Sequence, residues 1–179
     1  GPLRPSNDEY FFDDAESMGP RPQLITDFCG YNTYTGGHGA TTDDAYWVAD
    51  LTLTCDVEIT EGGDQPEVVV ELNEGVHCYR CRIDVSTGTA KLVSVNRYSG
   101  SGKSEEVLAE EQTDLVGTGD WELRFANVDN RICLWIDDDL VEFGDAANYI
   151  EDESQTPSPQ DEDLIPVGIA VRDAGAKVS

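Results

Sequence analysis

The chain has 179 residues, which is enough for one sizeable hydrophobic core and too few for two comfortable domains. Asp and Glu number 37 against 11 Lys and Arg, which gives a formal net charge of -26. This sign excludes binding through nucleic-acid phosphates, disfavours anionic membrane surfaces, and fits a highly solvated surface better than a dedicated cation site.

The ends of the chain differ in composition from its middle. Gly1-Pro2 is typical of the remnant that tag removal leaves. No apolar run is long enough for a membrane span or a signal peptide, so we expect a soluble chain. Acidic residues crowd residues 7–16 and 151–163. We predict an acidic N-terminal arm at 1–22 and a β-sandwich domain at 23–179, with an acidic loop near 151–163.

Alternation with a period of two predicts β-strands through the middle of the chain. Residues 45–59 place apolar side chains on one face and acidic or Thr side chains on the other, the pattern of a half-buried antiparallel strand. The Gly and Pro of 61–66 predict a break after it. Further strands are predicted at 67–72, 76–85, 89–98, 121–128, 131–137, 140–143 and 166–171.

Only one short helix is predicted, near 105–112, where Glu and Ala are frequent. Turn signals recur roughly every ten residues between the strands, as in all-β folds. Asn73-Glu74-Gly75, Ser86-Thr87-Gly88 and Asp129-Asn130 are such turns. The sequence therefore predicts an all-β fold, an antiparallel β-sandwich or jelly roll.

Cys78-x-x-Cys81 raises the possibility of a metal or redox site. In a strand, however, an offset of three places two side chains on opposite faces of the sheet. We therefore expect Cys81 to point inward and Cys78 outward, so that they cannot share a zinc ion. The five cysteines are odd in number and match no disulfide framework. We predict no cofactor.

Two further features could bind ligands. Asp137, Asp138 and Asp139 are weak calcium candidates, although a hairpin turn is the favoured interpretation because Asp bonds nearby backbone N–H groups. Trp135 is out of phase with Ile132, Leu134 and Ile136. An aromatic ring on the opposite sheet face could stack against a sugar or a peptide, or be covered by another segment of the chain.

Several segments, taken in order, resemble a β-sandwich insert of certain bacterial signal peptidase I proteins. They are LITDFCGYNTYT (24–35), YWVADLTLTCDVEI (46–59), YRCRIDVSTGTAKL (79–92), WELRFANVDNRICLWIDDDLVEF (121–143) and DLIPVGIAVRDAGAKVS (163–179). The resemblance covers most of the chain from about residue 23. It implies a fold of the concanavalin A-like, laminin-G-like lectin type.

The resemblance also implies a parent protein, a membrane-anchored serine endopeptidase that removes signal peptides outside the cytoplasm. Its nucleophile is a serine activated by a neutral lysine. Ser17-Met18-Gly19-Pro20 matches the Ser-Met-x-Pro of the serine box in letters, but it lies in an acidic arm. Lys91, Lys103 and Lys177 have no apolar setting that would lower a lysine pKa. We interpret the chain as a non-catalytic insert.

Three functions are considered from the sequence, in order of support. The first is a non-catalytic, extracytoplasmic accessory domain of a signal peptidase I, with the protease core of the same polypeptide and preprotein substrates as its partners. The alternative is a carbohydrate-binding module that holds a glycan on Trp135. A free-standing hydrolase with paired carboxylates ranks last, because no pair of carboxylates is marked by its spacing.

Overall fold

The computed structural model describes residues 26–27, 46–48, 50–74, 77–96, 104–149 and 164–179. The predicted acidic arm at 1–22, with its Ser17, and the predicted acidic loop at 151–163 lie outside these residues, so the domain division stays a prediction. Among the described residues, no helix has the length and apolar character needed to cross a membrane.

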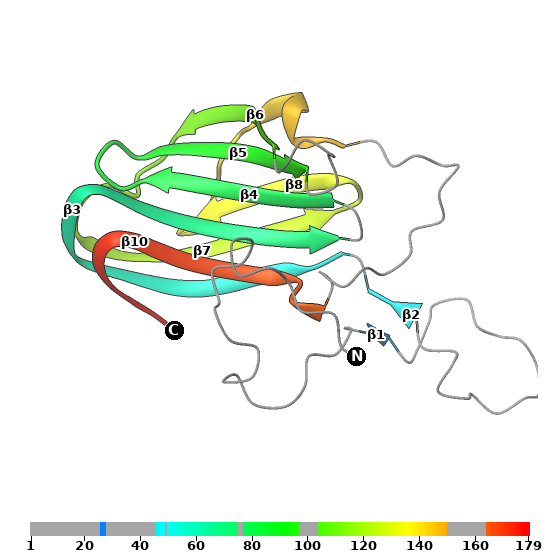
Figure 1. Ribbon diagram of the computed structural model, residues 1–179, viewed down its shortest axis with the longest axis horizontal. Coiled ribbons are helices and arrows are strands. Elements are labelled where there is room, and N and C mark those ends of the chain that lie inside the picture. Colours follow the sequence, from blue (N-terminus) through cyan, green and yellow to red (C-terminus); the bar gives the residue numbers. More distant parts are fainter. Residues whose placement is uncertain (1–25, 28–45, 49, 75–76, 97–103, 150–163) are drawn as a thin grey trace, which may run out of the picture.

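The described residues form strands joined by short turns, with one short 3-10 helix (Figure 1). The elements are β1 (Thr26–Asp27), β2 (Tyr46–Trp47), β3 (Thr52–Glu74), β4 (His77–Asp84), β5 (Thr89–Asn96), β6 (Ser104–Gln112), β7 (Gly119–Val128), β8 (Arg131–Ile136), β9 (Asp139–Leu140), the helix η2 (Gly144–Ala147) and β10 (Val167–Val178). Every strand pair is antiparallel.

Strand β3 is 23 residues long, and its two halves pair with different strands along one edge. Its N-terminal arm (52–59) pairs with β7, and its C-terminal arm (67–74) pairs with β4. Strand β10 runs along both arms on the opposite side. The predicted break at 61–66 is therefore wrong, because the chain bends there without leaving the ladder.

The bend is built from small residues on β3 and irregular pairing on β10. A side chain at Gly63 would collide with the carboxylate of Asp173, whose Oδ2 accepts a hydrogen bond from the Gln65 backbone N–H at 2.7 Å. Asp173 has a φ of 47°, and β10 shifts register on both sides of Ala174 and Gly175. These bulges let β10 bend at the same level as β3.

The bend folds one hydrogen-bonded sheet into two layers (Figure 1). Strands β6, β5, β4 and the C-terminal arm of β3 form the first layer. The N-terminal arm of β3 with β7, β8 and β9 forms the second layer. The predicted fold class, an all-β antiparallel sandwich, is confirmed.

The core lies between the two layers and receives alternate side chains from each strand. Its largest fully buried members come from both layers, namely Phe125, Ile59, Leu72, Ile83, Leu92, Leu115, Leu123, Ile132 and Leu134. Full burial of such a side chain contributes roughly 1.5–3 kcal/mol. The alternation that predicted the strands therefore also identifies the residues that hold the layers together.

A polar connection joins the layers at one end of the sandwich. Glu74 ends β3 and is only 5% exposed. Its Oε2 accepts hydrogen bonds from Asn127 Nδ2 of β7 at 2.7 Å and from the Tyr149 hydroxyl at 2.6 Å. The Tyr149 ring lies 4.9 Å from that of Tyr79, centroid to centroid. Burial and the hydrogen bond to Glu74 raise the pKa of the Tyr149 hydroxyl.

The predicted helix near 105–112 is wrong, because these residues form the edge strand β6. Helix propensity is a weak preference that tertiary pairing overrides. Strand β6 pairs with β5 along its length, and Leu108 and Ala109 pack against the core across a register shift next to Leu92. The other predicted strands overlap observed ones. Of the predicted strand at 140–143, only Leu140 lies in a strand, where it forms β9 together with Asp139.

The turn after β4 gives a test of backbone geometry. Gly88 has a φ of +74°, and an added Cβ would lie 2.5 Å from the Thr113 carbonyl oxygen. We expect Gly88→Ala to lower the free energy of unfolding by about 2 kcal/mol or more, through strain and this collision together. Urea denaturation followed by circular dichroism measures the change.

Gly117→Ala is the matched control for that substitution. Gly117 has a φ of +75°, but nothing lies within 4 Å of its added Cβ. It therefore carries only the left-handed strain, about 1 kcal/mol. If both variants lost the same free energy of unfolding, the expected collision with the Thr113 carbonyl oxygen would not contribute, which would contradict the prediction.

The connection at Glu74 predicts an alkaline pH dependence. The folded state holds the proton of Tyr149, whereas the unfolded chain releases it near a pKa of about 10. The stability from this group is complete below that pH and is lost as the pH rises further. We expect Tyr149→Phe to cost about 1–3 kcal/mol at pH 7, and the difference from the unmodified chain to shrink above pH 10. A constant difference between pH 7 and 11 in urea titrations would contradict this.

Candidate functional site

The outer face of the second layer carries the candidate site. The outward residues of its strands alternate with the core residues, and they are mostly polar. They include Thr52, Thr54, Asp56 and Glu58 of β3, Asp120, Glu122 and Arg124 of β7, and Cys133 and Trp135 of β8. This face therefore offers hydrogen-bonding groups next to one large aromatic ring.

Trp135 lies on the outer face, opposite to Ile132, Leu134 and Ile136, which are buried in the core. It is partly exposed, and its cross-strand neighbours are Arg124 of β7 and Leu140 of β9. Leu140 is 39% exposed. The structure thus places Trp135 on the face that its phase in the sequence predicts.

Arg124 approaches the ring of Trp135 from the neighbouring strand. The guanidinium carbon lies 5.8 Å from the ring centroid, within the range of a cation–π interaction. Its Nη2 contacts Glu122 Oε1 at 3.1 Å and Asp138 Oδ1 at 3.4 Å. These exposed ion pairs add little stability, but they hold a planar donor group beside the tryptophan.

Asp137 and Asp138 form the two-residue turn between β8 and β9, with φ values of 50° and 68°. The Asp137 Oδ1 accepts a hydrogen bond from the Glu122 N–H at 2.8 Å, and Asp138 faces Arg124. Asp139 belongs to β9 and pairs with Ile136. Within the described ranges, no group of three or more His, Cys, Asp or Glu side chains is arranged to hold a metal ion.

A groove of about 430 Å³ lies beside this turn. Strand register explains its lining, because Asp56 is paired with Glu122, while Glu58 is paired with Asp120 on one side and Lys177 on the other. Among the described residues, the lining consists of Asp56, Val57, Glu58, Asp120, Trp121, Glu122, Asp137, Lys177 and Ser179. The described part of the chain therefore contributes five side-chain carboxylates and one ammonium group to this hollow.

Sequence reasoning missed the groove. The alternating Asp and Glu of residues 50–58 and 120–122 are visible in the sequence. Their convergence depends on the pairing of strands that lie more than 60 positions apart in the chain. The alternation of acidic residues indicates that each strand has one exposed face. It does not predict how β3 and β7 are aligned with each other.

Cys78 and Cys81 do not form a site. They lie on opposite faces of β4, as strand alternation predicts. Cys81 is in the main core, and burial raises the pKa of its thiol. Cys78 is on the outer face, yet it is only 2% exposed and packs with Val93 and Val95. Neither thiol is therefore accessible at the surface.

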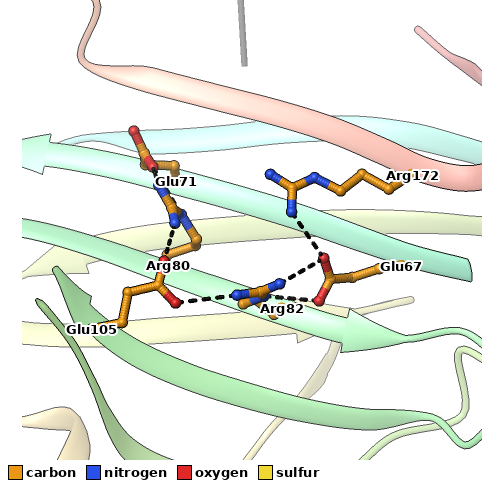
Figure 2. A network of polar contacts seen from close by, with 6 residues as sticks. All are labelled: Glu67, Glu71, Arg80, Arg82, Glu105 and Arg172. Atoms are coloured by element: carbon orange, nitrogen blue, oxygen red, sulfur yellow. Dashed lines mark hydrogen bonds and ion pairs between the residues drawn. The ribbon is translucent and has the colours of Figure 1, made fainter. Parts of the chain in front are cut away.

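The outer face of the first layer is occupied by a network of ion pairs (Figure 2). Arg80 donates to Glu71 at 2.9 Å, and Arg82 donates to Glu67 at 2.8 Å. Glu105 of β6 contacts both arginines, and Arg172 of β10 approaches Glu67 at 3.5 Å. The side chain of Glu71 is only 3% exposed. These charges neutralise one another, so this face offers few polar groups to a ligand.

Comparison with known proteins gives structural similarity alone. No family model matches the chain, and no curated protein sequence matches it. One similar solved structure is the carbohydrate-binding module CBM66 from Bacillus subtilis, at 18% identity, 73% coverage of this chain, 72% of that chain and a TM-score of 0.47. Another is sheep galectin-11 in complex with glycerol, at 13% identity, 89% and 98% coverage and a TM-score of 0.46.

Proposed function

We propose that this β-sandwich is a glycan-binding module that holds its ligand against Trp135 and Arg124 on the outer face of the second layer. The observation that carries the proposal is the partly exposed Trp135, with a guanidinium group 5.8 Å from its ring centroid. A tryptophan in this position supplies a rigid apolar surface with little conformational entropy to lose.

The neighbouring groups match the chemistry of a sugar. A pyranose ring has an apolar C–H face, which packs on an aromatic ring, and hydroxyl groups around its edge. The Arg124 fork donates hydrogen bonds to hydroxyl oxygens, and the carboxylates of Glu122 and Asp138 accept them from hydroxyl hydrogens. An apolar platform with a few oriented polar groups is the usual composition of a small-ligand site.

The test is binding to an array of immobilised glycans, followed by titration calorimetry with a soluble form of the glycan that binds most strongly. We expect Trp135→Ala to weaken binding by at least about 2 kcal/mol, roughly 30-fold in Kd. Trp135→Phe retains part of the aromatic surface, so its glycan affinity should lie between that of the unmodified chain and that of Trp135→Ala. Thermal unfolding checks that each variant is folded.

Val107→Ala is the control for loss of exposed apolar area away from the site. Val107 is on β6 of the first layer and is 51% exposed. It should leave glycan affinity unchanged. An array without a binder, or an affinity that does not respond to Trp135→Ala, would overturn the proposal.

The sequence resemblance supports a second proposal that is compatible with the first. The matched segments YRCRIDVSTG and WELRFANVD fall on β4 with its following turn and on β7. We propose that the sandwich is an extracytoplasmic accessory domain in a signal peptidase I, which acts on substrates or partners rather than on the peptide bond. The support is the resemblance of these strands and not the geometry of a catalytic site.

Removal of the sandwich from its parent protein tests this second proposal. We expect the shortened protease to accumulate to normal levels and to cleave a short signal-peptide substrate normally, but to process full-length preproteins more slowly. Immunoblots of preprotein and mature protein measure the effect in cells. Unchanged processing of preproteins, or a parent gene without a membrane anchor and a Ser/Lys protease core, would reject it.

A further inference from the structure

We propose that the glycan site is elongated and takes a linear oligosaccharide without acidic groups, running from Trp135 across Glu122 into the groove beside Lys177. This inference rests on the proposed glycan-binding function. It adds the length of the ligand and its charge class to that function.

The length follows from strand order and register. Trp135 is on β8, and the next strands across the layer are β7, the N-terminal arm of β3 and β10, which carries Lys177. Three strand spacings of about 4.8 Å and four residues along the strand separate the two side chains by roughly 20 Å. This distance exceeds one sugar ring and fits a chain of several.

The two ends of this path are physically continuous. Glu122 contacts Arg124 beside Trp135, and it also lines the groove. Asp137 binds the backbone of Glu122 and lines the same groove. A ligand that rests on Trp135 and extends toward Glu122 therefore enters the groove without crossing a barrier of core side chains.

The charge class follows from the lining. Of the lining residues that the structure describes, five are acidic, namely Asp56, Glu58, Asp120, Glu122 and Asp137, and one is basic, Lys177. Each carboxylate close to an acidic sugar group adds electrostatic repulsion even in bulk water. The groove therefore disfavours uronate and sulfate groups, whereas the hydroxyl groups of a neutral chain find acceptors at each step.

In the part of the chain that the structure describes, the outer face of the other layer offers no such path. Its charged side chains are engaged with one another across β3, β4, β6 and β10 (Figure 2). A glycan there would have to compete with these ion pairs for each hydrogen bond. The elongated site is thus assigned to the second layer.

Titration calorimetry with oligomers of increasing length tests the inference. The probes are the β-1,4-linked series of glucose and of N-acetylglucosamine, from one to six units, together with the neutral glycan bound most strongly on the array. An oligogalacturonate series is the acidic counterpart. We expect at least a tenfold gain in affinity from the shortest to the longest neutral oligomer that binds, and no such gain for the acidic series.

A double variant assigns that gain to the groove. Glu58→Ala with Asp120→Ala removes two exposed carboxylates of the groove and leaves Trp135 and Arg124 in place. It should abolish the gain with length while the affinity for the shortest ligand stays within about twofold. Glu106→Ala with Glu111→Ala, two exposed glutamates of β6, is the matched control and should change neither value.

The outcomes separate the two proposals. An affinity that does not depend on length, a gain that survives in the groove variant, or equal binding of the acidic series would overturn the elongated site alone. No binding of any glycan, or binding that is insensitive to Trp135→Ala, would overturn the glycan-binding function and the elongated site with it.

Discussion

The bend shared by β3 and β10 is the constraint on which the rest of the sandwich depends. One strand supplies the central ladder of both layers, so the two inner faces meet only if the chain turns near Gly63. The Asp173 carboxylate occupies the space that a side chain at Gly63 would need, and it binds the Gln65 N–H. Because β10 bends at the same level, the hydrogen-bonded edge continues from one layer into the other.

This arrangement also determines which surfaces are open to ligands. Each layer has one face in the core and one outer face. The two outer faces carry different kinds of side chain. The first layer carries arginines between glutamates, with Arg80 and Glu71 largely withdrawn from solvent. The described residues of the second layer place the Trp135 ring, Arg124 and a series of carboxylates on its outer face. The contrast between the two faces, rather than the fold, is the reason for placing the proposed site on the second layer.

Much of the fold could be predicted from local pattern, because alternation reports burial directly. The outward phase of Trp135 and the opposite faces of Cys78 and Cys81 followed from the period of two alone. The bend at 61–66 could not be predicted, since Gly and Pro signal a change of direction and not whether the ladder continues. The strand at 104–112 could not be predicted either, because its pairing with β5 outweighs the helix propensity of Glu and Ala.

The candidate site shows the same division between what is local and what depends on register. Trp135 is found from its own strand, but Arg124 and the groove become its neighbours only through the pairing of β7 with β8 and with β3. From the sequence alone, the high negative charge indicates only a solvated surface. The register adds that some of the carboxylates lie next to one another. Carboxylates of β3 and β7 that lie far apart in the sequence line one hollow. In the proposed glycan site, these carboxylates are the groups that offer acceptors to hydroxyl groups and repel acidic ligands.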